Sequence, residues 1–193
     1  MIRPFPVDLS VSAGGCIAAA LIVLILPLPW LTALFLAAAI HEVCHLLCLR
    51  LFMIRVFRIR IGMQGTAIET AALSPIQELL CAAAGPAGSF LCLLFLRHFP
   101  ILALCGLLQG SYNLLPIYPL DGGRIVHALA ALLFPHHAEA ICKFTSLFAV
   151  IGIFAVCLIL YFRTSIPIFL LCAGYFVLLS VLQRKTPCKG GQN

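Results

Sequence analysis

Two histidines and a glutamate lie within the apolar segment Ile40–Leu47, which reads IHEVCHLL. His41 and His45 are four residues apart, so on a helix they project from one face, one turn apart. Two neutral imidazoles placed in this way can bind one zinc ion, with Zn–N bonds of about 2.0–2.1 Å. Glu42 points away from the pair, so it stays unligated and can act on a zinc-bound water, as in the HExxH motif. The segment therefore predicts two zinc ligands and a catalytic base.

An alternative interpretation is that these three side chains only hydrogen-bond to one another or to neighbours within a helix bundle. Their surroundings argue against it. Ionisable residues are rare in membrane helices, and where they occur they are usually functional. This favours the metal site over a purely structural role.

A third ligand is needed, because a catalytic zinc normally takes three protein ligands and keeps one position open. Asp121 stands out among the remaining acidic residues because it lies in NLLPIYPLDGGR, Asn113–Arg124. The two prolines break a helix there and the two glycines allow a tight bend. Broken helix at membrane depth is tolerated only where it is buried in protein or lines a cavity. Spacing alone leaves a second interpretation open, in which Asp121 is a plain N-cap for a helix that begins at Gly122.

The elements that carry these residues are strongly apolar. Of the 193 residues, 63% are hydrophobic and only 9% are charged, whereas ordinary globular domains carry about 25% charged residues. The chain is therefore expected to be an integral membrane protein with one membrane domain, residues 1–193. Its basic residues lie beside hydrophobic segments, where they orient a membrane protein, so nucleic acid is not an expected partner.

The expected fold class is an all-α polytopic membrane protein with six transmembrane helices of about twenty residues each. The expected spans cover roughly residues 12–28, 31–52, 74–97, 100–115, 144–162 and 165–182. Ser74, Pro75 and Gln77 form a good helix start, because Ser can cap the helix and Gln three residues later can reach back. A short amphipathic helix is expected over residues 122–134.

Between the second and third expected spans the periodicity changes. Apolar and polar residues alternate from Phe57 to Gln64, which predicts a strand. Gly62 and Gly65 mark a turn, and Thr66–Thr70 can return as a second strand. We therefore expect a short β-hairpin at the membrane surface over Arg55–Thr70, whose free edge can align an extended substrate. The alternative is an irregular basic loop.

The basic residues predict the orientation of the spans. If six spans cross alternately, ten of the twelve Lys and Arg residues lie on one side and two, Arg97 and Arg163, lie on the other. The ten are Arg3, Arg50, Arg55, Arg58, Arg60, Arg124, Lys143, Arg184, Lys185 and Lys189. Positive residues mark the cytoplasmic side, so both termini are expected there, with residues 184–193 as a short cytoplasmic tail.

Two motifs together resemble the site-2 protease family of intramembrane zinc metalloproteases. These are HEVCH at residues 41–45 and NLLPIYPLDG at residues 113–122, and AGP at residues 84–86 is similar to a third element of that family. The resemblance covers a core of residues 31–133. The short loops and the six-span layout are most similar to the branch that contains stage IV sporulation protein FB, which implies a bacterial cytoplasmic membrane.

The resemblance implies one zinc ion held by His41, His45 and Asp121, with Glu42 as the acid–base catalyst of peptide hydrolysis. Asn113 is expected to contact the substrate backbone or the developing oxyanion. The alternative for Asn113 is a hydrogen bond between helices, a common use of polar side chains in membranes. Arg124 is expected to help hold Asp121.

The chain departs from the family pattern at several points. Ser89 stands where the family often has Asn, which puts a polar role there in doubt. Cys44 precedes the second histidine where Gly is frequent, so it either alters packing or supplies a redox-sensitive neighbour. The other cysteines form no CxxC pair and are expected to pack as small apolar residues. No segment is long enough for the CBS domain of the sporulation branch or for a PDZ domain.

These features predict an endopeptidase that cleaves in or near transmembrane segments in regulated intramembrane proteolysis. Its expected partners are a membrane-protein or membrane-tethered substrate, the lipid bilayer, and an inhibitory or regulatory membrane partner. Two alternatives stay open: a metal transporter that uses His and Asp, and an inactive relative that only binds membrane helices. Transporters tend to show broken helices in repeated halves, and the sequence contains no such repeat.

Overall fold

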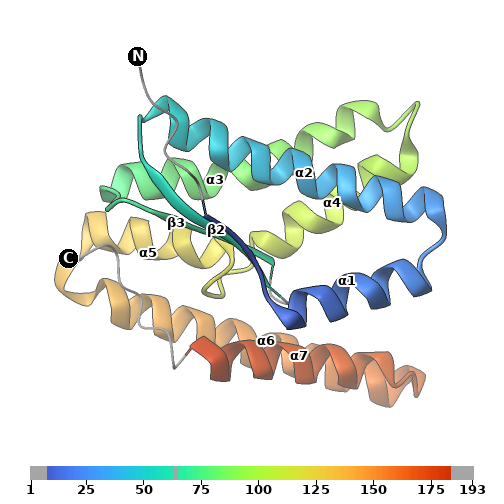
Figure 1. Cartoon of the computed structure of the whole chain (residues 1–193). Helices are drawn as coiled ribbons and strands as arrows, with labels where there is room; N and C mark the ends of the chain where they lie inside the picture. The colour runs from blue at the N-terminus through green and yellow to red at the C-terminus, as the bar shows by residue number, and fades with distance from the viewer. Residues whose placement is uncertain (1–7, 63–64, 184–193) are drawn as a thin grey trace. The chain divides into compact units, whose positions relative to one another are not determined.

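The structure, a computed structural model, describes residues 8–62 and 65–183 (Figure 1). The elements are β1 (Asp8–Val11), α1 (Ala13–Ile25), α2 (Leu28–Leu51), β2 (Val56–Gly62), β3 (Gly65–Thr70), α3 (Pro75–Leu91), the 3-10 helix η1 (Cys92–Phe95), α4 (Pro100–Asn113), α5 (Asp121–Leu133), the 3-10 helix η2 (Pro135–His137), α6 (Ala138–Thr164) and α7 (Ile168–Gln183). They form two compact units, one up to Ser111 and one from Tyr112 onwards. The expectation of a single domain stays a prediction.

Among the described residues, three helical stretches are long and apolar enough to cross a membrane: Leu28–Leu51, Pro75–Phe95 and Pro135–Thr164. The helices α1, α4 and α7 are shorter, with 13, 14 and 16 residues. Many large apolar side chains are exposed on these helices, as expected where a helix faces lipid. The membrane class is therefore supported, whereas the number of six spans stays a prediction.

In the first unit, α2 packs along α3. The expected start of α3 is confirmed: the backbone N–H of Gln77 donates to Ser74 Oγ at 3.3 Å, and the Gln77 side chain accepts from the Ser74 N–H at 3.0 Å. The reciprocal bonds satisfy two donors that a helix N-terminus otherwise leaves unpaired. A small core joins α2, η1 and α4, and it consists of Ala33, Ala37, Cys92, Leu102 and Cys105. Two of its five members are cysteines, which supports their expected packing role.

The first unit also contains a three-stranded sheet with the order β1-β2-β3. β2 and β3 pair antiparallel, with Ile59 opposite Ile68 and Arg58 opposite Glu69. β1 pairs with β2 in parallel, and Figure 1 shows it along the other edge of β2. The sequence analysis did not anticipate β1, because a four-residue strand is too short to show an alternating pattern. The expected turn residues 63–64 lie outside the described residues, and the place of the strands at a membrane surface stays a prediction.

The pairing determines which strand of the hairpin has a free edge. β2, which carries the clearest alternation, is paired on both sides and offers no free edge. Among the described residues, β3 pairs only with β2, so β3 is the edge of the hairpin that an extended segment can join.

In the second unit, α6 packs against both α5 and α7. The amphipathic helix expected over residues 122–134 is α5, which begins at Asp121 and ends at Leu133. The core of this unit consists of Ile117, Leu120 and Val150, with Tyr112, Leu115, Ala149, Ile153 and Phe176 packed against it. Ile117 has no exposed surface, so the irregular segment between α4 and α5 is anchored by one of its own side chains.

Candidate metal centre

His41 and His45 meet on the buried face of α2. Their side chains are 3% and 6% exposed, and their rings pack edge to face with centroids 4.7 Å apart. The two Nε2 atoms are 3.1 Å apart. Two ligands of a tetrahedral zinc ion with ordinary Zn–N bonds lie about 3.3 Å apart. The imidazole pair therefore fits two adjacent corners of a zinc site.

The opposite nitrogen of each ring is engaged by α3. His45 Nδ1 lies 2.7 Å from the carbonyl oxygen of Cys81, and His41 Nδ1 lies 2.8 Å from Ser89 Oγ. A carbonyl only accepts, so His45 must carry its proton on Nδ1, which makes Nε2 the nitrogen whose lone pair can bind a metal. Metal-binding histidines almost always have such a partner, which fixes the tautomer and the ring orientation.

Ser89 is a residue whose role the sequence analysis missed. It was noted only as a departure from the family pattern, yet its side chain has no exposed surface and contacts the first histidine of the motif. The spacing of Ser89 from other small residues in the sequence could have indicated this role. Cys81, Gly85 and Ser89 follow one another at intervals of four residues, so they share one face of α3, and all three contact the imidazole pair.

The close approach of α3 depends on glycine. A Cβ atom at Gly85 would collide with the rings of both His41 and His45. One turn further, a Cβ at Gly88 would collide with the side chain of Cys44. Small residues allow membrane helices to pack at short distance. Here they also place the hydrogen-bonding groups of α3 within reach of the rings, and the Cys44 thiol fills the space that Gly88 leaves.

Glu42 is half-buried and adjacent to His41 on α2. One residue along an α-helix is a rotation of about 100°, so its carboxyl group projects from a different side of the helix than the imidazole pair. That Glu42 is the catalytic base and not a metal ligand stays a prediction.

Asp121 belongs to the second unit and is the first residue of α5. The N-cap is Leu120, which makes no side-chain hydrogen bond, and the Asp121 side chain is 6% exposed. Asp121 therefore does not occupy the N-cap position that the alternative interpretation required. The N-terminal end of a helix favours a carboxylate through its dipole, and Arg124 Nη1 lies 3.9 Å from Asp121 Oδ1. The expected contact between Arg124 and Asp121 is confirmed.

The glycines after Asp121 fit the first turn of α5 against the preceding segment. A Cβ atom at Gly122 would meet the carbonyl oxygens of Leu114 and Leu115, and one at Gly123 would meet the backbone of Ile117 and Tyr118. These obstacles are backbone atoms, which cannot rotate away as a side chain can. The pair of glycines thus allows the first turn of α5 to lie directly against the segment that precedes Asp121.

Asn113 is the last residue of α4 and is half-buried in the second unit. The structure brings His41 and His45 together, and it places Asp121 and Asn113 at the two ends of the segment between α4 and α5. That Asp121 completes the metal site and that Asn113 contacts a substrate both stay predictions.

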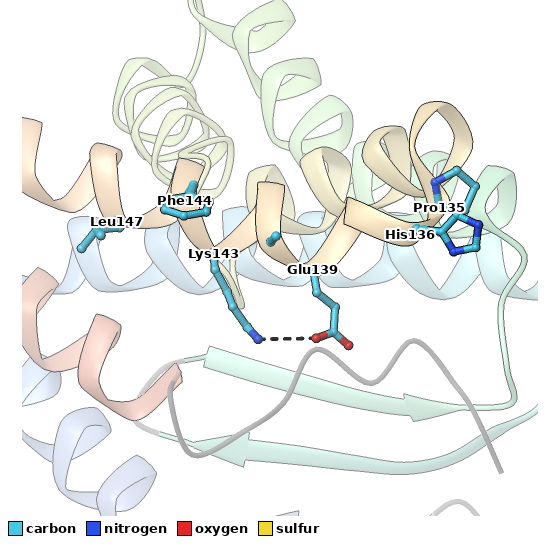
Figure 2. A pocket seen from close by; sticks show the side chains of 7 residues that line it. Pro135, His136, Glu139, Lys143, Phe144 and Leu147 are labelled. Atoms are coloured by element: carbon cyan, nitrogen blue, oxygen red, sulfur yellow. Dashed lines mark hydrogen bonds and ion pairs between the residues drawn. The ribbon is translucent and has the colours of Figure 1, made fainter.

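A separate pocket of about 540 Å³ lies along the start of α6 and includes none of these residues (Figure 2). Glu139 and Lys143 point toward one another at its polar side, with Lys143 Nζ 3.4 Å from Glu139 Oε2. Both side chains are more than half exposed, and exposed pairs of this kind contribute little to stability. His136, which also lines the pocket, is exposed.

No family model matches the chain. The chain is similar to a zinc metalloprotease of Methanocaldococcus jannaschii, with 28% identity over 159 residues that cover 75% of this chain and 45% of the relative. It thus spans less than half the length of the curated relative that it matches. Among solved structures it is similar to the site-2 protease from Methanocaldococcus jannaschii, with a TM-score of 0.62, 19% identity and 94% of each chain covered. The chain therefore has the fold of a site-2 protease, and its sequence is similar to that of a zinc metalloprotease.

Proposed function

We propose that this protein is an intramembrane zinc metalloendopeptidase of the site-2 protease family. The observation that carries the proposal is the imidazole pair: two Nε2 atoms 3.1 Å apart, with the other nitrogen of each ring engaged by α3. Burying two imidazoles in an apolar helix pair is unfavourable unless their ring nitrogens are engaged. A preorganised metal site explains why both rings present the same nitrogen to the same place.

Asp121 is proposed as the third ligand of a single zinc ion. It is a buried carboxylate at a helix N-terminus, it does not cap that helix, and it lies in the second motif of the resemblance. His, His and Asp are all zinc-ligating types. Two nitrogens and one oxygen with an open fourth position are typical of catalytic zinc, whereas structural sites are closed by four protein ligands.

The proposed reaction is hydrolysis of a peptide bond. A zinc ion at this site would supply a water of lowered pKa and would polarise the scissile carbonyl group. Glu42 accepts a proton from the attacking water as a C–O bond forms, and then donates that proton to the amine nitrogen as the C–N bond breaks. Asn113 hydrogen-bonds the substrate backbone or the developing oxyanion. The products are a carboxylate and a free amine.

The proposed substrates are membrane proteins or membrane-tethered proteins cut in or near a transmembrane segment, as in regulated intramembrane proteolysis. Because the proteolysis is proposed to be regulated, an inhibitory or regulatory membrane partner is also proposed. We place the protein in a bacterial cytoplasmic membrane as a multi-pass protein with both termini cytoplasmic, on the distribution of Lys and Arg. The likeness to the stage IV sporulation protein FB branch is retained as part of this proposal.

The first test replaces Glu42 with glutamine, which keeps the size of the side chain but cannot accept the proton. We expect cleavage of a co-expressed membrane substrate to fall by about 10²- to 10⁴-fold, while the purified variant keeps its zinc. Glu139→Gln is the matched control, because Glu139 is an exposed carboxylate on α6, and it should cleave like the parent protein. Undiminished cleavage by Glu42→Gln would exclude the proposed mechanism. A transporter has no need for Glu42 as a base, so its metal transport should not change.

The second test adds one methyl group at Gly85. The new Cβ would collide with both imidazole rings, so the rings must move and the zinc affinity should fall about tenfold or more. Gly152→Ala is the matched control, since no atom lies within 4 Å of a Cβ there, and it should bind zinc normally. Metal content and a chelator competition measure both. Equal affinity in the two variants would show that α3 does not set the ring positions.

The third test concerns the edge strand. Successive N–H groups of a strand point to opposite sides, so one of Ala67→Pro and Ile68→Pro removes a donor toward β2 and the other removes a donor on the free edge. If β3 aligns the substrate, the variant that lacks the donor on the free edge should keep its fold and its zinc. It should nevertheless lose most of its cleavage activity. Full cleavage by every folded proline variant would rule out strand addition at β3.

A further inference from the structure

Two side chains of α6 contact the backbone on either side of Asp121. The backbone N–H of Tyr118 donates to Ser146 Oγ at 3.2 Å. The Cys142 thiol donates to the carbonyl oxygen of Gly123 at 3.6 Å. These contacts lie three residues before and two residues after Asp121, so α6 holds the chain at both sides of the proposed ligand.

The residues that make these contacts share one face of α6. Cys142, Ser146 and Val150 are spaced by four residues, and all three are buried. Val150 packs in the apolar core with Ile117 and Leu120, which belong to the same irregular segment. This face is distinct from the exposed one that carries Glu139 and Lys143 in Figure 2.

Ser146 supplies what an apolar residue at this position could not. The segment between α4 and α5 is not helical, and the Tyr118 N–H donates to a side chain of α6. A buried donor without a partner is costly, and the hydroxyl of Ser146, itself only 3% exposed, accepts from it. This hydrogen bond holds the segment between α4 and α5 against the long helix α6.

We propose that Ser146 is a positioning residue for Asp121: its hydroxyl sets the path of the segment that delivers the carboxylate to the metal. The inference rests on the proposed function, in which Asp121 is the third zinc ligand. Ligands must be held within about 0.5 Å of their working position, and a carboxylate at the end of a broken helix has less intrinsic rigidity than a histidine within α2. Asp121 therefore depends more than the imidazole pair does on a contact from another helix to fix its position.

The experiment measures zinc affinity by chelator competition on the purified full chain, together with the visible absorption of the Co²⁺-substituted protein. Ser146→Ala should weaken zinc binding about tenfold and shift the Co²⁺ bands, which report ligand geometry. Ser146→Thr keeps the hydroxyl and should restore both. Thr145→Val is the matched control, because the Thr145 hydroxyl bonds only the carbonyl oxygens of Ile141 and Cys142 in its own helix, and it should bind both metals like the parent.

A double-mutant cycle separates this inference from the proposed function. If Ser146 acts through Asp121, Ser146→Ala should cause no further loss in an Asp121→Asn background. If the losses of zinc affinity in the two single variants add fully in the double variant, the positioning role is overturned. It is also overturned if Ser146→Ala keeps the parent's zinc affinity while Asp121→Asn clearly loses affinity. Unchanged affinity in Asp121→Asn itself would instead overturn the proposed ligand set.

Should Ser146→Ala not fold, Cys142→Ala provides the same test from the other side of Asp121. It removes the weak thiol contact to Gly123, so a smaller loss of zinc affinity is expected, about twofold to fivefold on the usual scale of weak hydrogen bonds. That loss should also vanish in the Asp121→Asn background. A Cys142→Ala protein with the parent's affinity and Co²⁺ spectrum would contradict anchoring by α6.

Discussion

Two imidazole rings buried between apolar helices impose the constraint on which the rest of the first unit depends. Their nitrogens cannot be left without partners in such surroundings. The Cys81 carbonyl and the Ser89 hydroxyl take one nitrogen of each ring, and both come from a single face of α3. That contact is possible only because Gly85 brings the backbone of α3 against the rings. The packing of α3 and the orientation of the two imidazole rings are thus determined by the same three positions of one helix.

The second unit meets a different constraint. Asp121 follows a break between α4 and α5, where the backbone has lost regular helical hydrogen bonds and must find others. Ile117 anchors the break in an apolar core, Gly122 and Gly123 allow the tight approach, and Ser146 accepts from the Tyr118 N–H. The backbone of His41 and His45 is fixed by α2, so only the side-chain rotamers have to be set. For Asp121, the position of the backbone must be fixed as well.

The sequence was informative wherever a property depends on residues close together in the chain. The pairing of His41 with His45, the reciprocal bonds of Ser74 and Gln77, and the position of α5 all follow from spacings of a few residues. Contacts between distant residues could not be predicted in this way. Ser89 contacts a residue 48 positions earlier, and Ser146 contacts one 28 positions earlier. The four-residue spacing places Ser89 on one face of α3 with Cys81 and Gly85, but nothing local to either serine identifies the distant residue that it contacts. That contact is created only when two helices meet.

The sheet has a consequence for the order in which the protein is assembled. β1 pairs with β2 in parallel, and the paired residues Asp8 and Arg58 are about fifty positions apart, with α1 and α2 between them. Closing so long a loop has an entropic cost before any pairing is gained. During synthesis β1 leaves the ribosome first, but it has no partner until both intervening helices have been made. The pairing of β1 with β2 can therefore form only after α1 and α2 have left the ribosome. A completed sheet thus indicates that both helices have already been synthesised.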